Sequence, residues 1–118
     1  MNARANGARY ENFALAHLER AGLDLIARNA GCRHGELDLV MRDGDTVVFV
    51  EVRYRASSGF GDGLDSVGAA KRAKLVRAAA VYLARNPHLA SRPCRFDVIA
   101  LTGDATTVDW CRNAFETH

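Results

Sequence analysis

The chain has 118 residues, of which 48% are apolar and 25% are charged, and it contains only two prolines. This composition is typical of a globular protein with one buried core, and it excludes a disordered tail and a fibrous repeat. The length leaves no room for a second catalytic domain. We therefore expect a single domain over residues 1–118.

The lack of a recognisable targeting signal and the spacing of the cysteines predict a cytoplasmic protein. No stretch approaches the roughly 18 apolar residues of a membrane span, and no apolar segment follows a basic start, so membrane insertion and secretion are not expected. The three cysteines, Cys32, Cys94 and Cys111, are widely spaced and include no CxxC pair. They indicate neither a disulfide framework nor a zinc site, and we expect them to be reduced.

The positive charge is concentrated in one segment. The formal net charge of +2 is too small to identify a protein that binds polyanions. Residues 66–86, however, carry five cations and no acid, which leaves eleven cations against fourteen acids elsewhere. The five cations are Lys71, Arg72, Lys74, Arg77 and Arg85.

Hydrophobic spacing and turn residues divide the chain into seven elements. Apolar residues at intervals of three and four predict a helix over residues 5–21 that Gly22 ends. Strands are expected over residues 23–29, 36–42 and 46–53, followed by a glycine-rich mobile loop over residues 56–65. A second helix, over residues 66–86, should be capped by Ser66 and ended by Pro87, and two strands over residues 95–102 and 107–112 complete the chain. The order α-β-β-β-α-β-β predicts an α/β fold with a mixed sheet.

A hairpin around Asp43-Gly44 brings acidic side chains together. Glu51 interrupts a strand that is otherwise apolar on both faces, and the preceding strand carries Glu36 and Asp38. A two-residue loop of Asp43-Gly44 sets Glu36 opposite Glu51 and Asp38 diagonal to it. A four-residue loop over residues 43–46 sets Asp38 directly opposite Glu51. Both registers place like charges about 4.5–8 Å apart, which destabilises a sheet unless a cation neutralises them.

Carboxylates on rigid strands with few soft ligands nearby favour Mg²⁺ or Mn²⁺, which take oxygen ligands, over Zn²⁺. The alternative is a structural arrangement in which Arg53 neutralises Glu51 on the same face of the strand while Glu36 and Asp38 are solvated. Both interpretations fit the residues alone.

Glu11 adds a fourth carboxylate to this set. It precedes Leu18 by seven residues, nearly two helical turns, and so lies on the same stripe of the first helix. The alternative is a boundary residue paired with Arg4 or Arg9. Chain geometry alone does not decide between the two.

The basic segment also has two interpretations. Lys71, Lys74, Ala78 and Arg85 lie roughly along one stripe of the second helix, with Arg72 and Arg77 beside it. Such a stripe contacts phosphates without reading sequence, or it is an exposed helix face that cations keep soluble.

Several blocks of the sequence together resemble the YraN-like family of small bacterial proteins. This family is grouped with the restriction-endonuclease-like nucleases of the PD-(D/E)xK kind and is similar to archaeal Holliday-junction resolvases. The resemblance covers nearly the whole chain in order and spacing. The blocks are Gly7-x-x-x-Glu11-x-x-Ala14-x-x-x-Leu18, Gly35-Glu36-Leu37-Asp38-Leu39-Val40, Phe49-Val50-Glu51-Val52-Arg53, Lys71, residues 79–83 and Arg95-Phe96-Asp97-Val98-Ile99.

The resemblance implies a restriction-endonuclease-like fold with a mixed central sheet flanked by helices. It implies that Asp38 and Glu51 are the metal-binding acids, that Arg53 is the basic member of the site and that Glu11 is the helix acid of resolvase-like branches. Glu36 would be an auxiliary metal ligand, and Lys71 a basic residue at the start of the second helix. A homodimer on two-fold-symmetric DNA is a further expectation, although no residue pattern identifies an interface.

The chain departs from the PD-(D/E)xK pattern at two positions. Leu37 stands where proline usually precedes the first acid, and Arg53 stands in place of lysine. A guanidinium with a pKa above about 12 stabilises charge but does not act as a base. The resemblance and the acidic cluster together imply a Mg²⁺- or Mn²⁺-dependent endonuclease-like protein that acts on DNA, including branched or structured DNA. Its nucleic-acid contacts would be Lys71, Arg72, Lys74 and Arg77. The alternatives are a nucleic-acid-binding module without turnover and an interaction protein whose acidic cluster docks a partner.

Overall fold

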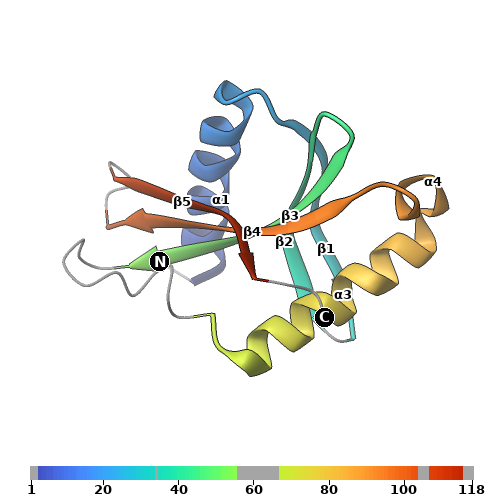
Figure 1. Cartoon of the computed structure of the whole chain (residues 1–118). Helices are drawn as coiled ribbons and strands as arrows, with labels where there is room; N and C mark the ends of the chain where they lie inside the picture. Colours follow the sequence, from blue (N-terminus) through green and yellow to red (C-terminus); the bar gives the residue numbers. More distant parts are fainter. Residues whose placement is uncertain (1–2, 34, 56–66, 104–106, 116–118) are drawn as a thin grey trace.

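The chain forms a five-stranded mixed sheet with helices on both faces (Figure 1). The computed structural model describes residues 3–33, 35–55, 67–103 and 107–115, and the side chains of this range except those of residues 3–7 and 55. The elements are α1 (Ala3–Arg20), β1 (Asp24–Cys32), β2 (Gly35–Asp43), β3 (Thr46–Arg55), α3 (Ala69–Arg85), α4 (Pro87–Ala90), β4 (Cys94–Thr102) and β5 (Val108–Phe115).

The sheet has the strand order β1-β2-β3-β4-β5. Three neighbouring pairs are antiparallel, and only β3 and β4 are parallel. A parallel pair needs a crossover connection, which the segment containing α3 and α4 supplies. The mixed α/β fold expected from the sequence is therefore confirmed.

The sheet separates two apolar cores. On one face, Ala14 and Leu18 of α1 pack against a cluster that includes Met41 of β2 and Ile99 of β4. On the other face, the buried stripe of α3 packs against a cluster centred on Phe49. Leu75, Ala78 and Ala79 of that stripe are buried, and Tyr82 and Leu83 pack against the same cluster. Because both faces are covered, the middle strands are apolar on both sides.

Several element boundaries differ from the prediction. The strand expected over residues 23–29 continues to Cys32, and the strand expected over residues 107–112 continues to Phe115. Each continues through an asparagine with positive φ, Asn29 (52°) and Asn113 (51°), a conformation that asparagine tolerates better than most residues. Both strands therefore continue through a left-handed residue instead of ending there.

The second helix begins later than predicted and is followed by a short helix that was not predicted. α3 starts at Ala69 with Gly68 as its N-cap, whereas the expected cap, Ser66, lies outside the described residues, as does the expected mobile loop over residues 56–65. Pro87 ends α3 and also occupies the first turn of α4, where its missing N–H costs nothing. None of the helices in the described ranges combines the length and apolarity that a membrane crossing requires.

The β2–β3 turn decides between the two hairpin registers. Arg42 pairs with Val47 and Asp43 pairs with Thr46, so the two-residue loop is Gly44-Asp45 and not Asp43-Gly44. Gly44 has a φ of 61°, which suits a glycine in a tight turn. The pairing is therefore the one that sets Asp38 opposite Glu51, and the register that paired Glu36 with Glu51 is wrong.

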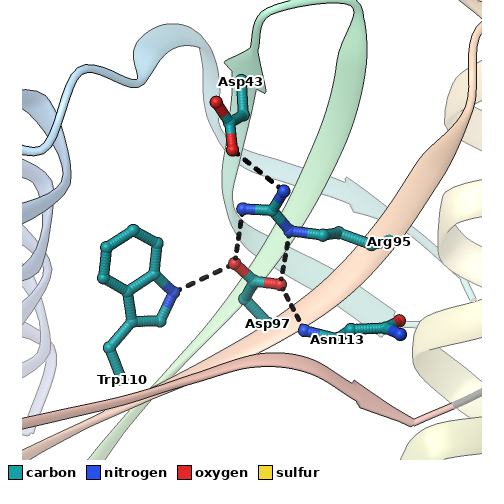
Figure 2. Close-up of polar contacts among 5 residues, drawn as sticks. All are labelled: Asp43, Arg95, Asp97, Trp110 and Asn113. Atoms are coloured by element: carbon teal, nitrogen blue, oxygen red, sulfur yellow. Dashed lines mark hydrogen bonds and ion pairs between the residues drawn. The ribbon is translucent and has the colours of Figure 1, made fainter.

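A buried carboxylate, Asp97, ties β4 to β5 and to the hairpin (Figure 2). Its side chain is 1% exposed. Oδ1 accepts hydrogen bonds from Arg95 Nε (3.0 Å) and Asn113 N (2.9 Å), and Oδ2 accepts from Arg95 Nη2 (3.2 Å) and Trp110 Nε1 (3.0 Å). Arg95 Nη1 also donates to Asp43 Oδ2 (2.9 Å). These contacts satisfy the buried charge, so we interpret Asp97 as structural.

We predict that Asp97→Ala lowers the free energy of unfolding by about 3–5 kcal/mol, because it leaves the mostly buried Arg95 guanidinium with Asp43 alone and removes the acceptor of the Trp110 and Asn113 N–H groups. Urea denaturation measures this change. Asp45→Ala is the control: the Asp45 side chain is 96% exposed and its ion pair with Arg92 is long (3.9 Å), so stability should remain nearly unchanged. Equal losses in the two variants would contradict the structural role of Asp97.

Candidate functional site

Asp38 is held at the point where the β2–β3 ladder ends. Leu39 pairs with Val50, so the next position along the strands sets Asp38 opposite Glu51. The backbone N–H of Val52 donates to Asp38 Oδ2 at 2.9 Å. A side-chain carboxylate thus takes the hydrogen bond that a strand carbonyl would otherwise accept, and it is drawn toward β3.

Side-chain alternation along β2 is interrupted at the same point. Leu37 belongs to the core under α3, whereas Leu39 belongs to the core under α1, although residues two apart on a regular strand share a face. Leu37 pairs with Ala30 and Leu39 pairs with Arg28, so the interruption lies between them, where Asn29 of β1 has a φ of 52°. Around Asp38, residues two apart on β2 therefore do not lie on the same face of the sheet.

Three carboxylates converge at this interruption. Oxygen atoms of Glu11, Glu36 and Asp38 all lie within 4.8 Å of one another. Glu11 comes from α1, and the other two come from β2. The group therefore combines the helix acid, the auxiliary ligand and the first metal-binding acid of the sequence prediction.

Two residues of β1 that the sequence did not identify support this group. Arg28 Nη2 lies 3.8 Å from Glu11 Oε1. The Asn29 amide, oriented so that Nδ2 faces the carboxylates, donates to Glu36 Oε1 and Glu11 Oε1, at 3.0 Å each. Partial burial and the charge of Asp38 raise the pKa of Glu11, and Arg28 acts in the opposite direction. Glu11 is thus paired with Arg28 of β1 and not with Arg9, one of the two partners of the structural alternative. The side chain of the other, Arg4, lies outside the described residues.

Glu51 lies on the other side of Asp38, in a more buried position. The residue is 7% exposed, and its Oε2 atom forms no hydrogen bond within the described part of the chain, although Lys71 Nζ lies 3.5 Å away. Burial raises the pKa of Glu51 to about 8, with further contributions from the charge of Asp38 and a hydrogen bond with the Asp38 carboxyl group. Lys71 and Arg53 lower this pKa, Lys71 more strongly.

Asp38 and Glu51, the two predicted metal-binding acids, therefore lie beside each other, with one difference from the prediction. Asp38 contacts both groups, the Glu11–Glu36 pair and Glu51, but the three acids within 4.8 Å of one another do not include Glu51. Arg53 acts on Glu51 through its charge, and the closer cation is Lys71 of α3. The structural alternative, in which Arg53 neutralises Glu51, is thereby weakened.

The predicted basic stripe of α3 is divided. Ala78, which was placed in the stripe, is buried in the core. Arg72 Nε donates to Val67 O at 2.7 Å, and its guanidinium lies 5.7 Å from the centre of the Phe115 ring, so its polar groups are partly engaged in local contacts. Lys71, Lys74 and Arg77 are exposed.

Two of the exposed cations lie beside the acids. Lys71 contacts Glu51, and a Cβ atom at Gly35, the residue before Glu36, would lie 3.8 Å from Lys74 Cβ. The first turns of α3 therefore place the Lys71 ammonium group against Glu51 and the base of the Lys74 side chain beside Gly35. An arrangement of acids able to hold a cation, bordered by lysines able to hold an anion, suits a substrate that carries phosphate.

We predict that the free energy of unfolding of the metal-free protein falls as the pH rises from about 5 to about 8. In this window folded Glu51, with a pKa of about 8, keeps a proton that the unfolded chain has released near its ordinary pKa of about 4.3. The folded state binds more protons than the unfolded state, so protonation of Glu51 stabilises the folded protein at low pH. This stabilisation is lost as the pH rises through 8.

Urea denaturation at several pH values tests this linkage with two variants. Glu51→Gln, which stays neutral, should flatten the pH dependence and exceed the wild type by a few kcal/mol at pH 8. Glu19→Gln, which changes an exposed glutamate of α1, should follow the wild type. A pH dependence unchanged by Glu51→Gln would show that Glu51 is not protonated in this range.

Comparison with known proteins gives a family but no activity. The sequence profile described as "Uncharacterised protein family UPF0102" matches residues 10–101. A UPF0102 protein of Ectopseudomonas mendocina (strain ymp) is 58% identical over 111 residues, covering 93% of each chain. A UPF0102 protein of Stutzerimonas stutzeri (strain A1501) is 52% identical over 116 residues, covering 97% of each chain. One from Xanthomonas campestris pv. campestris (strain B100) is 56% identical over 109 residues, covering 92% of this chain and 89% of the relative.

Proposed function

The chain belongs to the uncharacterised protein family UPF0102, and we propose that it is a metal-dependent, endonuclease-like protein that binds DNA and hydrolyses its phosphodiester bonds. Its fold would then be of the restriction-endonuclease-like kind, with a PD-(D/E)xK-type site. The observation that carries the proposal is the convergence of Glu11, Glu36 and Asp38 within 4.8 Å, with the buried Glu51 against Asp38.

The donor set fits a hard divalent cation. All four groups offer carboxylate oxygens, which Mg²⁺ and Mn²⁺ prefer, and no cysteine or histidine belongs to the three-acid group. Like charges at such separations oppose folding unless a proton or a cation compensates them. The pKa values of Glu11 and Glu51 are raised, so proton binding at these carboxyl groups is one way in which the like charges are compensated. We infer that Asp38 is the central ligand, assisted by Glu36, Glu51 and Glu11.

When bound, Mg²⁺ or Mn²⁺ supplies Lewis acidity toward a phosphodiester and toward water. The residues of the chain supply position. Asp38 is fixed by the N–H of Val52, and Glu51 is buried on β3, which continues as a ladder with β4 through this region, so these two carboxylates have little freedom to rearrange. Such preorganised charge lowers the cost of binding a reacting phosphate in a defined orientation.

Lys71 is the cation best placed to act on the phosphate. Its Nζ atom lies 3.5 Å from Glu51 Oε2, within the site, and its side chain is 45% exposed. Arg53 adds a guanidinium that can hold a phosphate through two hydrogen bonds but does not accept a proton near neutral pH. Lys74 and Arg77 extend the positive charge along α3 and would contact neighbouring phosphates.

A second function is favoured by one specific feature, Arg53 in place of the lysine of the PD-(D/E)xK pattern. In this case the protein binds nucleic acid on the same surface without turnover. It predicts salt-dependent DNA binding that charge reversal at Lys74 and Arg77 weakens, with no cleavage in the presence of either metal.

We predict that the protein cleaves branched or duplex DNA in Mg²⁺ or Mn²⁺ and that Asp38→Asn lowers the cleavage rate by more than about 100-fold. Loss of an outer partner of a metal site already costs about 10–100-fold, and Asp38 would be a ligand itself. Gel assays with labelled junction and duplex substrates measure the rate, with Asp45→Asn, a change to an exposed acid of the hairpin turn, as the control.

Three outcomes are distinguishable in this assay. Cleavage lost in Asp38→Asn but kept in Asp45→Asn supports hydrolysis at this site. Equal residual cleavage in both variants rejects catalysis by Asp38. DNA binding by the wild type without any cleavage favours the non-hydrolytic alternative.

A further inference from the structure

We propose that Tyr54 and Tyr10 form a stacking platform for an unpaired nucleobase beside the acidic site. This inference rests on the proposed function and narrows its substrate class to DNA with at least one exposed base near the scissile phosphate. The platform is defined by the two tyrosine side chains, one on β3 and one on α1.

Each tyrosine of the platform is next in the sequence to a residue of the proposed site. Tyr54 follows Arg53 on β3, and Tyr10 precedes Glu11 on α1. Tyr54 is three residues beyond Glu51, which at the rise of a β-strand is roughly 10 Å along the chain. Because successive side chains of a strand alternate between faces, Tyr54 lies with Val52 on the face covered by α1, whereas Glu51 lies on the α3 face against Lys71. The platform is therefore on the same face of the sheet as α1, the helix that carries Glu11.

The two rings are held in place. Their centres are 4.7 Å apart with an interplanar angle of 27°, a stacked arrangement. The Tyr10 hydroxyl donates to the carbonyl oxygen of Gly103 at 3.2 Å. The backbone of Tyr54 pairs with Leu101 in the β3–β4 ladder. Little conformational freedom would therefore be lost when a base stacks on this pair.

The outer part of the pair is accessible. Tyr54 is 50% exposed although one side of its ring is covered by Tyr10. The other large exposed apolar side chains in the described part of the chain are Phe13 and Leu25. Phe13 lies in a shallow surface groove of α1 with Arg9 and Asn12, and that groove includes no acid of the site. Of the three, Tyr54 is the one that directly follows a candidate site residue in the sequence.

An aromatic ring of this kind selects for unpaired bases. In a duplex both faces of each base are covered by its neighbours, whereas a base in a single strand, a flap or an opened junction presents a free face. Stacking on an aromatic side chain tolerates any base, so the platform would select structure and not sequence.

The test uses a DNA strand that carries 2-aminopurine, whose fluorescence is quenched when it stacks. The strand is used single-stranded and annealed to its complement, in Ca²⁺, which supplies a hard cation in place of Mg²⁺. Wild-type protein should quench the unpaired probe and bind it more tightly than the paired probe. Tyr54→Leu should lose the added quenching and weaken binding to the unpaired probe by about 5- to 150-fold, the range of base–aromatic stacking.

Three further variants separate stacking from folding and from general DNA binding. Tyr54→Phe keeps the ring and should behave as the wild type. Tyr54→Ile is a second ringless variant with high strand propensity, for use if the leucine variant unfolds. Phe13→Leu removes an exposed aromatic ring of the α1 groove and should leave binding unchanged.

Binding to both probes with the same quenching in the wild type and in Tyr54→Leu would overturn the platform and leave the proposed function standing. A wild-type protein that binds neither probe at low salt would overturn the proposed function and the platform together. Binding to the unpaired probe that falls in the ringless variants alone would support both.

Discussion

The hydrogen bond from the N–H of Val52 to Asp38 Oδ2 is the interaction on which the candidate site depends. It occurs where the β2–β3 ladder stops, and it replaces a backbone acceptor with a carboxylate. By drawing Asp38 toward β3, it places that acid against Glu51, while the Asn29 amide contacts Glu36 and Glu11 on its other side. A regular strand would keep Glu36 and Asp38 on one face of the sheet, whereas the interruption between Leu37 and Leu39 turns Glu36 toward the face that α1 covers.

The two buried acids among the described residues, Glu51 and Asp97, show what separates a functional acid from a structural one. Asp97 accepts four hydrogen bonds from an arginine, a tryptophan and a backbone N–H, so its charge is fully compensated (Figure 2). Glu51 has an oxygen without a hydrogen bond, a like-charged neighbour and a single lysine at 3.5 Å. The first arrangement holds two strands together, and the second leaves a site that gains stability from a proton or a cation.

The order of the main elements could be predicted because helix and strand periodicities differ and because glycine, proline and asparagine mark most boundaries. Markers of this kind also account for the differences: Pro87 predicts only a stop although it also begins α4, and β1 continues through Asn29 and Gly31 to Cys32. The proximity of Asp38 and Glu51 followed from hairpin pairing. The support from Arg28 and Asn29, and the proximity of Lys71 to Glu51, arise from tertiary packing between segments with no local signal in either.

Direct measurement of metal binding tests the central claim, that Asp38 gathers carboxylates which together hold a divalent cation. Titration of the metal-free protein with Mn²⁺, followed by electron paramagnetic resonance of the free ion, gives the stoichiometry and affinity for the wild type, for Asp38→Asn and for Asp45→Asn. We predict at least one bound Mn²⁺ per chain in the wild type and in Asp45→Asn, and its loss in Asp38→Asn. Equal binding by all three proteins, or no binding by the wild type, would contradict the account.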